Sequence, residues 1–260
     1  MNIHIPRKRF GQNFLVDPNI IRQIIQAIDP KPDDAIVEIG PGLGALTQVL
    51  LPMTKHLTVI ELDRDLISPL RMACVDLGEL IIHQADALKF DFSTLETSNK
   101  KLRIVGNLPY NISTALIFHL LTFQSLIKDM HFMLQQEVVE RLAAAPGSKA
   151  YGRLSVMVQY HCQVEPLFQV PPTAFRPAPK VYSAIVRLTP YETPPYHAEN
   201  PELFAKIVNQ AFQQRRKTLR NCLKGIVPIK CLEDLGIDPQ LRPEQLSLKN
   251  YVEISNLTPN

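Results

Sequence analysis

Hydrophobic positions in the first half of the chain fall into short runs that alternate with helical patterns. After Asp17 and Pro18, which suit the start of a helix, five isoleucines recur on one helical face within residues 20–28. Short apolar runs predict strands at 35–39, 57–62, 80–83 and 102–105. Helical patterns occur beside them at 45–51, 64–74 and 113–123. This alternation predicts a mostly parallel sheet with helices on both faces, on which ligands bind beyond the carboxyl ends of the strands.

The pattern changes after Tyr151. A helix or strand is indicated at 154–160, an extended segment at 162–170 and a strand at 181–188. Residues 190–201 contain four prolines and two tyrosines with little apolar content, which is typical of a linker. The segments beyond it have short helical patterns. We therefore expect two domains: an α/β domain over 1–190 and a small α-helical domain over 191–260.

Composition narrows the class of protein. The chain has 260 residues, of which 45% are hydrophobic, so it is long enough to bury a core. No run approaches the length of a membrane span, and no apolar segment follows the basic start of the sequence. The four cysteines lack metal-ligand spacing, which favours buried thiols. We expect a cytoplasmic protein with no metal centre and no obligate protein partner, and hence a monomer.

Charge is distributed unevenly along the chain. The total is +3, yet residues 33–100 carry a net charge of −6 and residues 176–225 one of +6. Such asymmetry suggests a polyanionic partner for the basic part, whereas the acidic part would repel a phosphate-rich ligand. A solvated surface explains the basic part equally well.

A glycine-rich turn, E-I-G-P-G-L-G at 38–44, lies between a strand and a helix. Glycine lets the backbone turn sharply and approach a ligand, and Glu61, 21 residues beyond Gly40, can accept both hydroxyls of a ribose. This spacing suits a nicotinamide dinucleotide as well as S-adenosylmethionine. The net negative charge nearby favours the cationic S-adenosylmethionine. Asp86, just past the third strand, can accept from an adenine amine or cap a turn.

The string N-L-P-Y follows the fourth strand. An aromatic amine is a poor nucleophile because its lone pair is delocalised into the ring. The side-chain oxygen of Asn107 and the main-chain carbonyl of Leu108 can each accept one amine hydrogen and draw the nitrogen toward tetrahedral geometry. Pro109 stiffens the loop, and Tyr110 offers a ring on which an extruded base can stack. An ordinary turn is the alternative explanation.

A basic segment follows the linker. If residues 212–224 form one helix, Arg216, Arg220 and Lys224 line one stripe at intervals of four residues, which suits contact with phosphates. A solvated helix face is the alternative. Further cations that we expect to contact folded RNA are Arg7, Lys8, Arg9, Arg176 and Lys180.

Taken together, seven ordered motifs resemble the ribosomal RNA adenine dimethyltransferases over essentially the whole chain. They are R-K-R-F-G-Q-N-F-L, E-I-G-P-G-L-G, E-L-D, D-A-L, G-N-L-P-Y-N-I-S, A-F-R-P-A-P-K-V-Y-S-A-I-V-R-L and R-R-K-T-L-R-N. The resemblance implies a Rossmann-like class I methyltransferase fold and S-adenosylmethionine as cofactor. It is stronger to the bacterial small-subunit enzymes, which doubly methylate two adjacent adenines in a hairpin near the 3′ end of 16S ribosomal RNA, within an assembling 30S subunit. The macrolide-resistance enzymes acting on 23S ribosomal RNA share several of the motifs.

The resemblance also implies residue roles. The cofactor would be contacted by Asn13, Leu15, Gly40, Glu61, Asp86 and Asn107. The target adenine would be held by Asn107, Leu108 and Tyr110. Phe175 is a second stacking candidate, although it could equally pack under its neighbouring prolines. Two other functions stay open at this point: a nicotinamide-dependent oxidoreductase and a non-catalytic RNA-binding factor of ribosome assembly.

Overall fold

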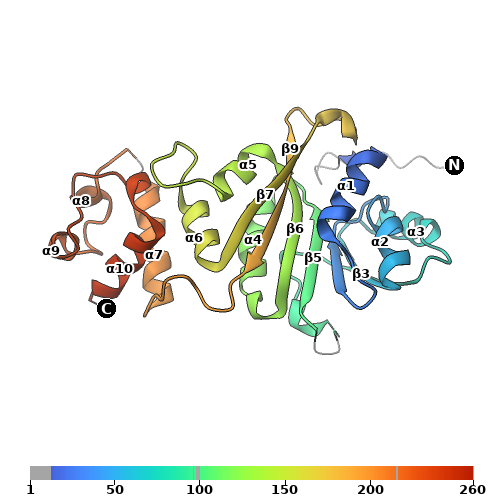
Figure 1. Ribbon diagram of the computed structural model, residues 1–260, viewed down its shortest axis with the longest axis horizontal. Coiled ribbons are helices and arrows are strands. Elements are labelled where there is room, and N and C mark those ends of the chain that lie inside the picture. Colours follow the sequence, from blue (N-terminus) through green and yellow to red (C-terminus); the bar gives the residue numbers. More distant parts are fainter. Residues whose placement is uncertain (1–12, 96, 98–99, 215, 260) are drawn as a thin grey trace. The chain divides into compact units, whose positions relative to one another are not determined.

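The structure is a computed structural model that describes residues 13–95, 97, 100–214 and 216–259. Its main element is a seven-stranded sheet with the strand order β4-β3-β2-β5-β6-β9-β7 (Figure 1). The strands β2 to β6 run parallel, and β9 pairs antiparallel with β6. The strand bounds are β2 Ala35–Ile39, β3 His56–Glu61, β4 Glu79–Gln84, β5 Leu102–Asn107, β6 Ile127–Gln135, β7 Cys162–Val170 and β9 Ser183–Pro190. This confirms the predicted mostly parallel α/β sheet.

In the described part of the chain, five α-helices accompany the parallel strands. Asp17 caps the first of them by accepting a hydrogen bond from the Asn19 amide at 2.8 Å, and Pro18 occupies its first turn, as the sequence predicts. The isoleucine face of this helix is buried in the core. The helix bounds are α1 Pro18–Ile28, α2 Thr47–Thr54, α3 Arg64–Ala73, α4 Ser113–Leu121 and α5 Gln136–Leu142.

Two features of this unit have no clear signal in the sequence. The strand β6 contains a continuous apolar run over 132–134, but its polar residues Asp129 and His131 obscure the pattern. A two-stranded sheet joins β1 Phe14–Leu15 to β8 Phe175–Arg176 in antiparallel pairing. Such short pairings have no periodic signal, because each strand has only two residues.

The chain divides into two compact units, but not at a single point. The first unit contains residues 1–139 and 165–190, and the second contains 140–164 and 191–260. The division at residue 190 coincides with the boundary expected from the sequence, whereas residues 140–164, which we expected in the first domain, fall in the second unit. The reason is packing: Val156 and Tyr160 share a hydrophobic core with residues of the C-terminal helices.

The second unit is helical. Its core is built around Phe204, Tyr251 and other fully buried side chains. The helix bounds are α6 Arg153–His161, α7 Pro201–Gln213, α8 Leu219–Cys222, α9 Ile229–Asp234 and α10 Leu248–Leu257. The helical character predicted for residues 191–260 is thus confirmed in the secondary structure.

The single helix expected over 212–224 does not form. The helix α7 ends at Gln213, and α8 has only four residues. The amide of Leu219 donates to the Leu241 carbonyl at 2.8 Å and that of Arg220 to the Pro239 carbonyl at 3.0 Å. In a continuous helix these amides would bond four residues back. Tertiary partners therefore replace the helical ones and break the helix.

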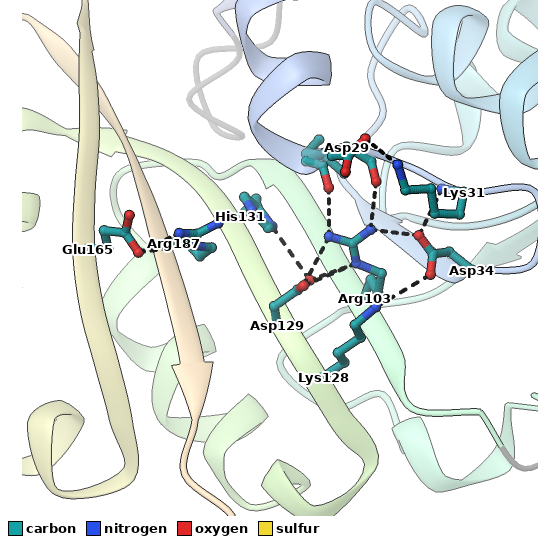
Figure 2. A network of polar contacts seen from close by, with 10 residues as sticks. Asp29, Lys31, Asp34, Arg103, Lys128, Asp129, His131, Glu165 and Arg187 are labelled. Carbon is teal, nitrogen blue, oxygen red and sulfur yellow. Dashed lines mark hydrogen bonds and ion pairs between the residues drawn. The ribbon is translucent and has the colours of Figure 1, made fainter.

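A buried ionic network ties α1 to the amino-terminal ends of the neighbouring strands (Figure 2). The guanidinium of Arg103, on β5, donates to Asp129 at 3.0 Å, to Asp34 at 2.6 Å and to the Ile28 carbonyl at 2.6 Å. Burial by itself raises the pKa of both carboxyl groups, but their hydrogen bonds and the adjacent cations lower the pKa of each below its usual value. The network closes the end of the sheet opposite to the carboxyl ends of the parallel strands.

We expect Arg103→Leu to lower the free energy of unfolding by about 3–5 kcal/mol, because it leaves the buried carboxylate of Asp129 and the half-buried one of Asp34 without the guanidinium that both contact. Urea denaturation measures this change. The matched control is Lys31→Ala, which breaks an exposed ion pair with Asp29 and should leave the free energy of unfolding nearly unchanged. A loss below about 1 kcal/mol for Arg103→Leu would contradict the importance of the network.

Candidate active site

A cavity of about 760 Å³ opens at the carboxyl ends of β2, β3 and β5. Its volume is that of a site for a small organic ligand. The cavity lies within the first unit. The cavity is lined by eight of the residues to which the sequence analysis gave a role, and these residues come from five separate segments of the chain. They are Asn13, Leu15, Gly40, Glu61, Asp86, Asn107, Leu108 and Tyr110.

The glycine-rich turn forms one wall of the cavity. Gly40 and Gly42 have φ angles of 67° and 59°, which side chains other than glycine rarely adopt. A Cβ atom on Gly42 would lie 3.2 Å from the Phe14 ring, so the turn also packs closely against β1. The amide of Gly40 donates to the Ile60 carbonyl at 2.9 Å. These contacts hold the backbone of the turn beside the cavity.

Glu61 ends β3 with its carboxylate held by the backbone. The amide of Asp63 donates to Oε1 at 2.8 Å and that of Gly42 to Oε2 at 3.2 Å. Burial raises the pKa of Glu61, while these amides act in the opposite direction. Each carboxylate oxygen has a second acceptor position, so the group can also accept a pair of neighbouring hydroxyls.

Glu38 is a cavity residue to which sequence analysis gave no role beyond its charge. It is 2% exposed, and its Oε2 accepts from the Thr47 hydroxyl at 2.6 Å. The pKa of Glu38 is raised to about 7, mainly by burial and also by the charge of the nearby Glu61. The hydrogen bond from Thr47 has the opposite effect and lowers this pKa, but it is outweighed. The signal available in the sequence was an acidic residue at the end of an apolar strand. A cation in the cavity would favour the ionised form of this group.

Asp86 caps a turn and also lines the cavity. Its Oδ1 accepts from the Leu88 amide at 3.0 Å, which is the turn-capping arrangement. The residue also lines the cavity, beside Ala85 and Ala87. The cap therefore positions the carboxyl group at the cavity wall.

Asn107 ends β5 and has a defined amide orientation. Its Nδ2 donates to the Asn13 carbonyl at 3.0 Å. Because that carbonyl can only accept, Nδ2 must face β1, and Oδ1 is directed away from it as an acceptor. The preceding Gly106 is needed for this placement, since a Cβ there would lie 2.6 Å from the Ile39 carbonyl oxygen.

The rest of the N-L-P-Y loop is held by the sheet. The Leu108 amide donates to the Met133 carbonyl at 3.2 Å, and the Leu108 side chain is buried. The Tyr110 hydroxyl lies 2.7 Å from the Ser183 hydroxyl on β9, and burial raises the pKa of Tyr110. The loop thus presents a side-chain amide, a main-chain segment and an aromatic ring to one cavity.

Phe175 does not supply a stacking surface in this structure. Its side chain is fully buried and packs in the hydrophobic core that includes Leu15 and Ala174. The pairing of β8 with β1 draws it inward. This burial argues against the predicted contact of Phe175 with a target base and agrees with the alternative of packing.

The predicted phosphate contacts lie on exposed segments rather than on one helix face. Arg216 precedes α8, Arg220 lies within it and Lys224 follows it, and all three are exposed. Arg176 and Lys180 belong to the first unit, and the Arg176 guanidinium donates to the Phe175 carbonyl at 2.8 Å. The predicted contacts Arg7, Lys8 and Arg9 lie outside the described residues.

Three of the cysteines, Cys74, Cys162 and Cys222, are buried thiols as predicted, whereas Cys231 is partly exposed. In the part of the chain that the structure describes, His, Cys, Asp and Glu form no group of three or more that could hold a metal ion. No helix among those described combines the length and the apolar character needed to cross a bilayer.

The pKa of Glu38 predicts a pH-dependent stability. In the folded protein this pKa is about 7, above the usual 4.5, so the stability associated with the protonated form is lost as the pH rises through 7. Glu38→Gln cannot ionise. When the pH is raised from about 5 to about 8, we therefore expect the free energy of unfolding of the wild type to fall by about 2–3 kcal/mol relative to that of Glu38→Gln. Denaturant unfolding at several pH values measures this.

Thr47→Val is the matched second variant. It removes a hydrogen bond that lowers the pKa of Glu38, so the loss of stability should shift to higher pH. Parallel pH curves for the wild type and Glu38→Gln would show that folding does not raise the pKa of Glu38.

Known proteins match this chain over nearly its full length. The family model for ribosomal RNA adenine dimethylase matches residues 3–259. Two similar relatives are named ribosomal RNA small subunit methyltransferase A. The one from Saccharophagus degradans is 60% identical to this chain, and the match covers 98% of this chain and 96% of the relative's length. That of Marinobacter nauticus is 58% identical over 98% of this chain and 92% of its own.

A solved structure supports the same assignment. The crystal structure of a dimethyladenosine transferase from Plasmodium falciparum is 29% identical, superposes with a TM-score of 0.79, and covers 93% of this chain and 95% of its own. The predicted Rossmann-like class I methyltransferase fold is thereby confirmed. The chain belongs to the ribosomal RNA adenine dimethylase family.

Proposed function

We propose that this protein transfers methyl groups from S-adenosylmethionine to the exocyclic amines of two adjacent adenines in a hairpin near the 3′ end of 16S ribosomal RNA, two methyl groups to each. The observation that carries the proposal is the oriented amide of Asn107, whose Oδ1 faces away from Asn13 at the end of β5. Its position beside Leu108 and Tyr110, in the cavity that also contains Glu61, supports the same reaction.

The residues of the cavity fit S-adenosylmethionine. Glu61, with both oxygens held by backbone amides, would accept the ribose hydroxyls, and Asp86 would accept from the adenine amine. Asn13, Leu15 and Gly40 would contact it from the strand and the turn. When bound, this cofactor supplies a methyl group activated by a positively charged sulfur. The buried carboxylates Glu38 and Glu61 favour such a cation and disfavour the pyrophosphate of a nicotinamide dinucleotide.

The chain's own groups then act on the target base. The Tyr110 ring would stack on the extruded adenine. Asn107 Oδ1 and the Leu108 carbonyl would each accept one hydrogen of the amine, which concentrates the lone pair on the nitrogen and directs it toward the methyl group. Each transfer leaves a positive charge on the nitrogen, which then releases one proton to water. After the first transfer one N–H remains, and either acceptor can still hold it, so the same site can perform the second transfer.

The nucleic acid would be recognised outside the cavity. Exposed cations at Arg216, Arg220 and Lys224 are suited to phosphates, and an RNA folded within the assembling 30S subunit would be held by shape and charge. Such a substrate means that the protein acts in the cytoplasm, and we propose that it does so as a monomer. The relatives' names favour the small subunit over a 23S substrate, and the complete N-L-P-Y loop favours catalysis over binding alone.

The test of this function is nucleoside analysis of small-subunit RNA incubated with the protein and labelled S-adenosylmethionine. The wild type should yield dimethyladenosine. Asn107→Ala should lower turnover by about 100-fold or more, because one of the two acceptors of the amine is lost. Calorimetric titration should show that the variant still binds S-adenosylmethionine.

Wild-type turnover by Asn107→Ala would refute the role of its amide. Tight binding of a nicotinamide dinucleotide, together with no binding of S-adenosylmethionine, would refute the proposed reaction and support an oxidoreductase.

The proposed RNA contacts predict a change in salt dependence. Neutralising Arg216 and Arg220 together should weaken RNA binding and reduce the slope of log affinity against log salt by about 1.5, because fewer counterions are released. Filter binding over a salt series measures the slope. The matched control neutralises Lys230 and Lys249, two exposed cations elsewhere in the same unit. An unchanged slope in the Arg216 and Arg220 variant would exclude this surface as a phosphate contact.

A further inference from the structure

The N-L-P-Y loop is joined to a distant strand through one pair of hydroxyls. The Tyr110 hydroxyl lies 2.7 Å from Ser183 Oγ, although the two residues are 73 positions apart in the chain. Ser183 is the first residue of β9 and pairs with Gln135 of β6, and it is fully buried. Its side chain is therefore held on a rigid part of the sheet.

The backbone of Tyr110 is held independently of this bond. Its carbonyl accepts from the Ser113 hydroxyl at 3.2 Å, and the Pro109 carbonyl accepts from the Ile112 amide at 3.2 Å. Both contacts fix the start of α4. They leave the Tyr110 side chain free to rotate, and a bond at the far end of the ring limits that rotation.

The Ser183 hydroxyl has no evident role in the strand itself. The next residues of β9, Ala184, Ile185 and Val186, are apolar and buried, so a small apolar residue would serve the sheet equally well. Within the described part of the chain, the side chain that the Ser183 hydroxyl contacts is that of Tyr110. The hydroxyl is thus directed at the one aromatic side chain of the N-L-P-Y loop.

We propose that Ser183 is a positioning residue, whose hydroxyl holds the Tyr110 ring at the angle at which the target adenine stacks. This inference rests on the proposed function and adds a residue to it. A ring that is already held in place loses less conformational entropy when the base arrives, and it keeps the amine in line with the methyl group. Ser183 would act through Tyr110 and would touch neither cofactor nor base.

A double-mutant cycle tests the inference. Ser183→Ala and Tyr110→Phe each remove the bond from one side, and each should lower kcat about tenfold while the affinity for S-adenosylmethionine stays unchanged. The double variant should lose no more than either single variant, because the same interaction is removed only once. Thr54→Val is the matched control: it removes another buried hydroxyl bond of the same unit, outside the cavity, and should keep wild-type turnover.

Stacking gives a second readout that a loss of stability alone would not change. An RNA hairpin with 2-aminopurine at one target position should lose fluorescence on binding the wild type, through contact with the Tyr110 ring. The loss should be smaller for Ser183→Ala and for Tyr110→Phe, at protein concentrations that saturate the RNA. Equal quenching by these variants and the wild type would overturn the proposal.

The outcomes separate this inference from the proposed function. If Tyr110→Ala keeps wild-type turnover, the stacking role of Tyr110 fails and the inference fails with it. If Tyr110→Ala is inactive while Ser183→Ala and Tyr110→Phe turn over like the wild type, only the inference fails. Additive losses in the cycle would also overturn it. Should Ser183→Ala not fold, Tyr110→Phe removes the same bond from the less buried side and decides the question by kcat and quenching.

Discussion

The parallel register of β2, β3 and β5 is the constraint on which the site depends. In this register Val37 of β2 pairs with Thr58 on one side and with Ile104 on the other. The three strands consequently end at one edge of the sheet, and the segments that come directly after them in the chain meet there. The glycine-rich turn, Glu61 and Asn107 come together for this reason.

Burial then sets the electrostatic character of the cavity. Glu38 is almost inaccessible to water, and Glu61 is nearly so, which makes their negative charge costly without a cation nearby. A ligand with a positive centre relieves that cost, whereas a phosphate would increase it. The cationic methyl donor that we propose therefore suits the burial of these groups as much as their residue type.

The two side chains that we propose to act on the target base are held by distant segments of the chain. Asn107 is oriented by the Asn13 carbonyl, and the Tyr110 hydroxyl is bonded to Ser183 on β9. Neither partner is close to the N-L-P-Y loop in sequence. The loop itself supplies the amide and the aromatic ring, and the orientation of these side chains comes from segments that the fold brings to it.

The sequence by itself determined the alternating α/β pattern, the Asp17 cap of α1 and the positions of Gly40, Glu61 and Asn107 at or just after strand ends, because each of these depends on local periodicity or on the residues at the end of a strand. Only the tertiary structure decided the rest. Phe175 is buried because β8 pairs with β1, and the expected helix over 212–224 breaks because Leu219 and Arg220 bond to distant carbonyls. Residues 140–164 join the C-terminal helices because their apolar side chains share one core, and the raised pKa of Glu38 reflects burial. Such outcomes depend on contacts between residues far apart in the chain, which no local pattern contains.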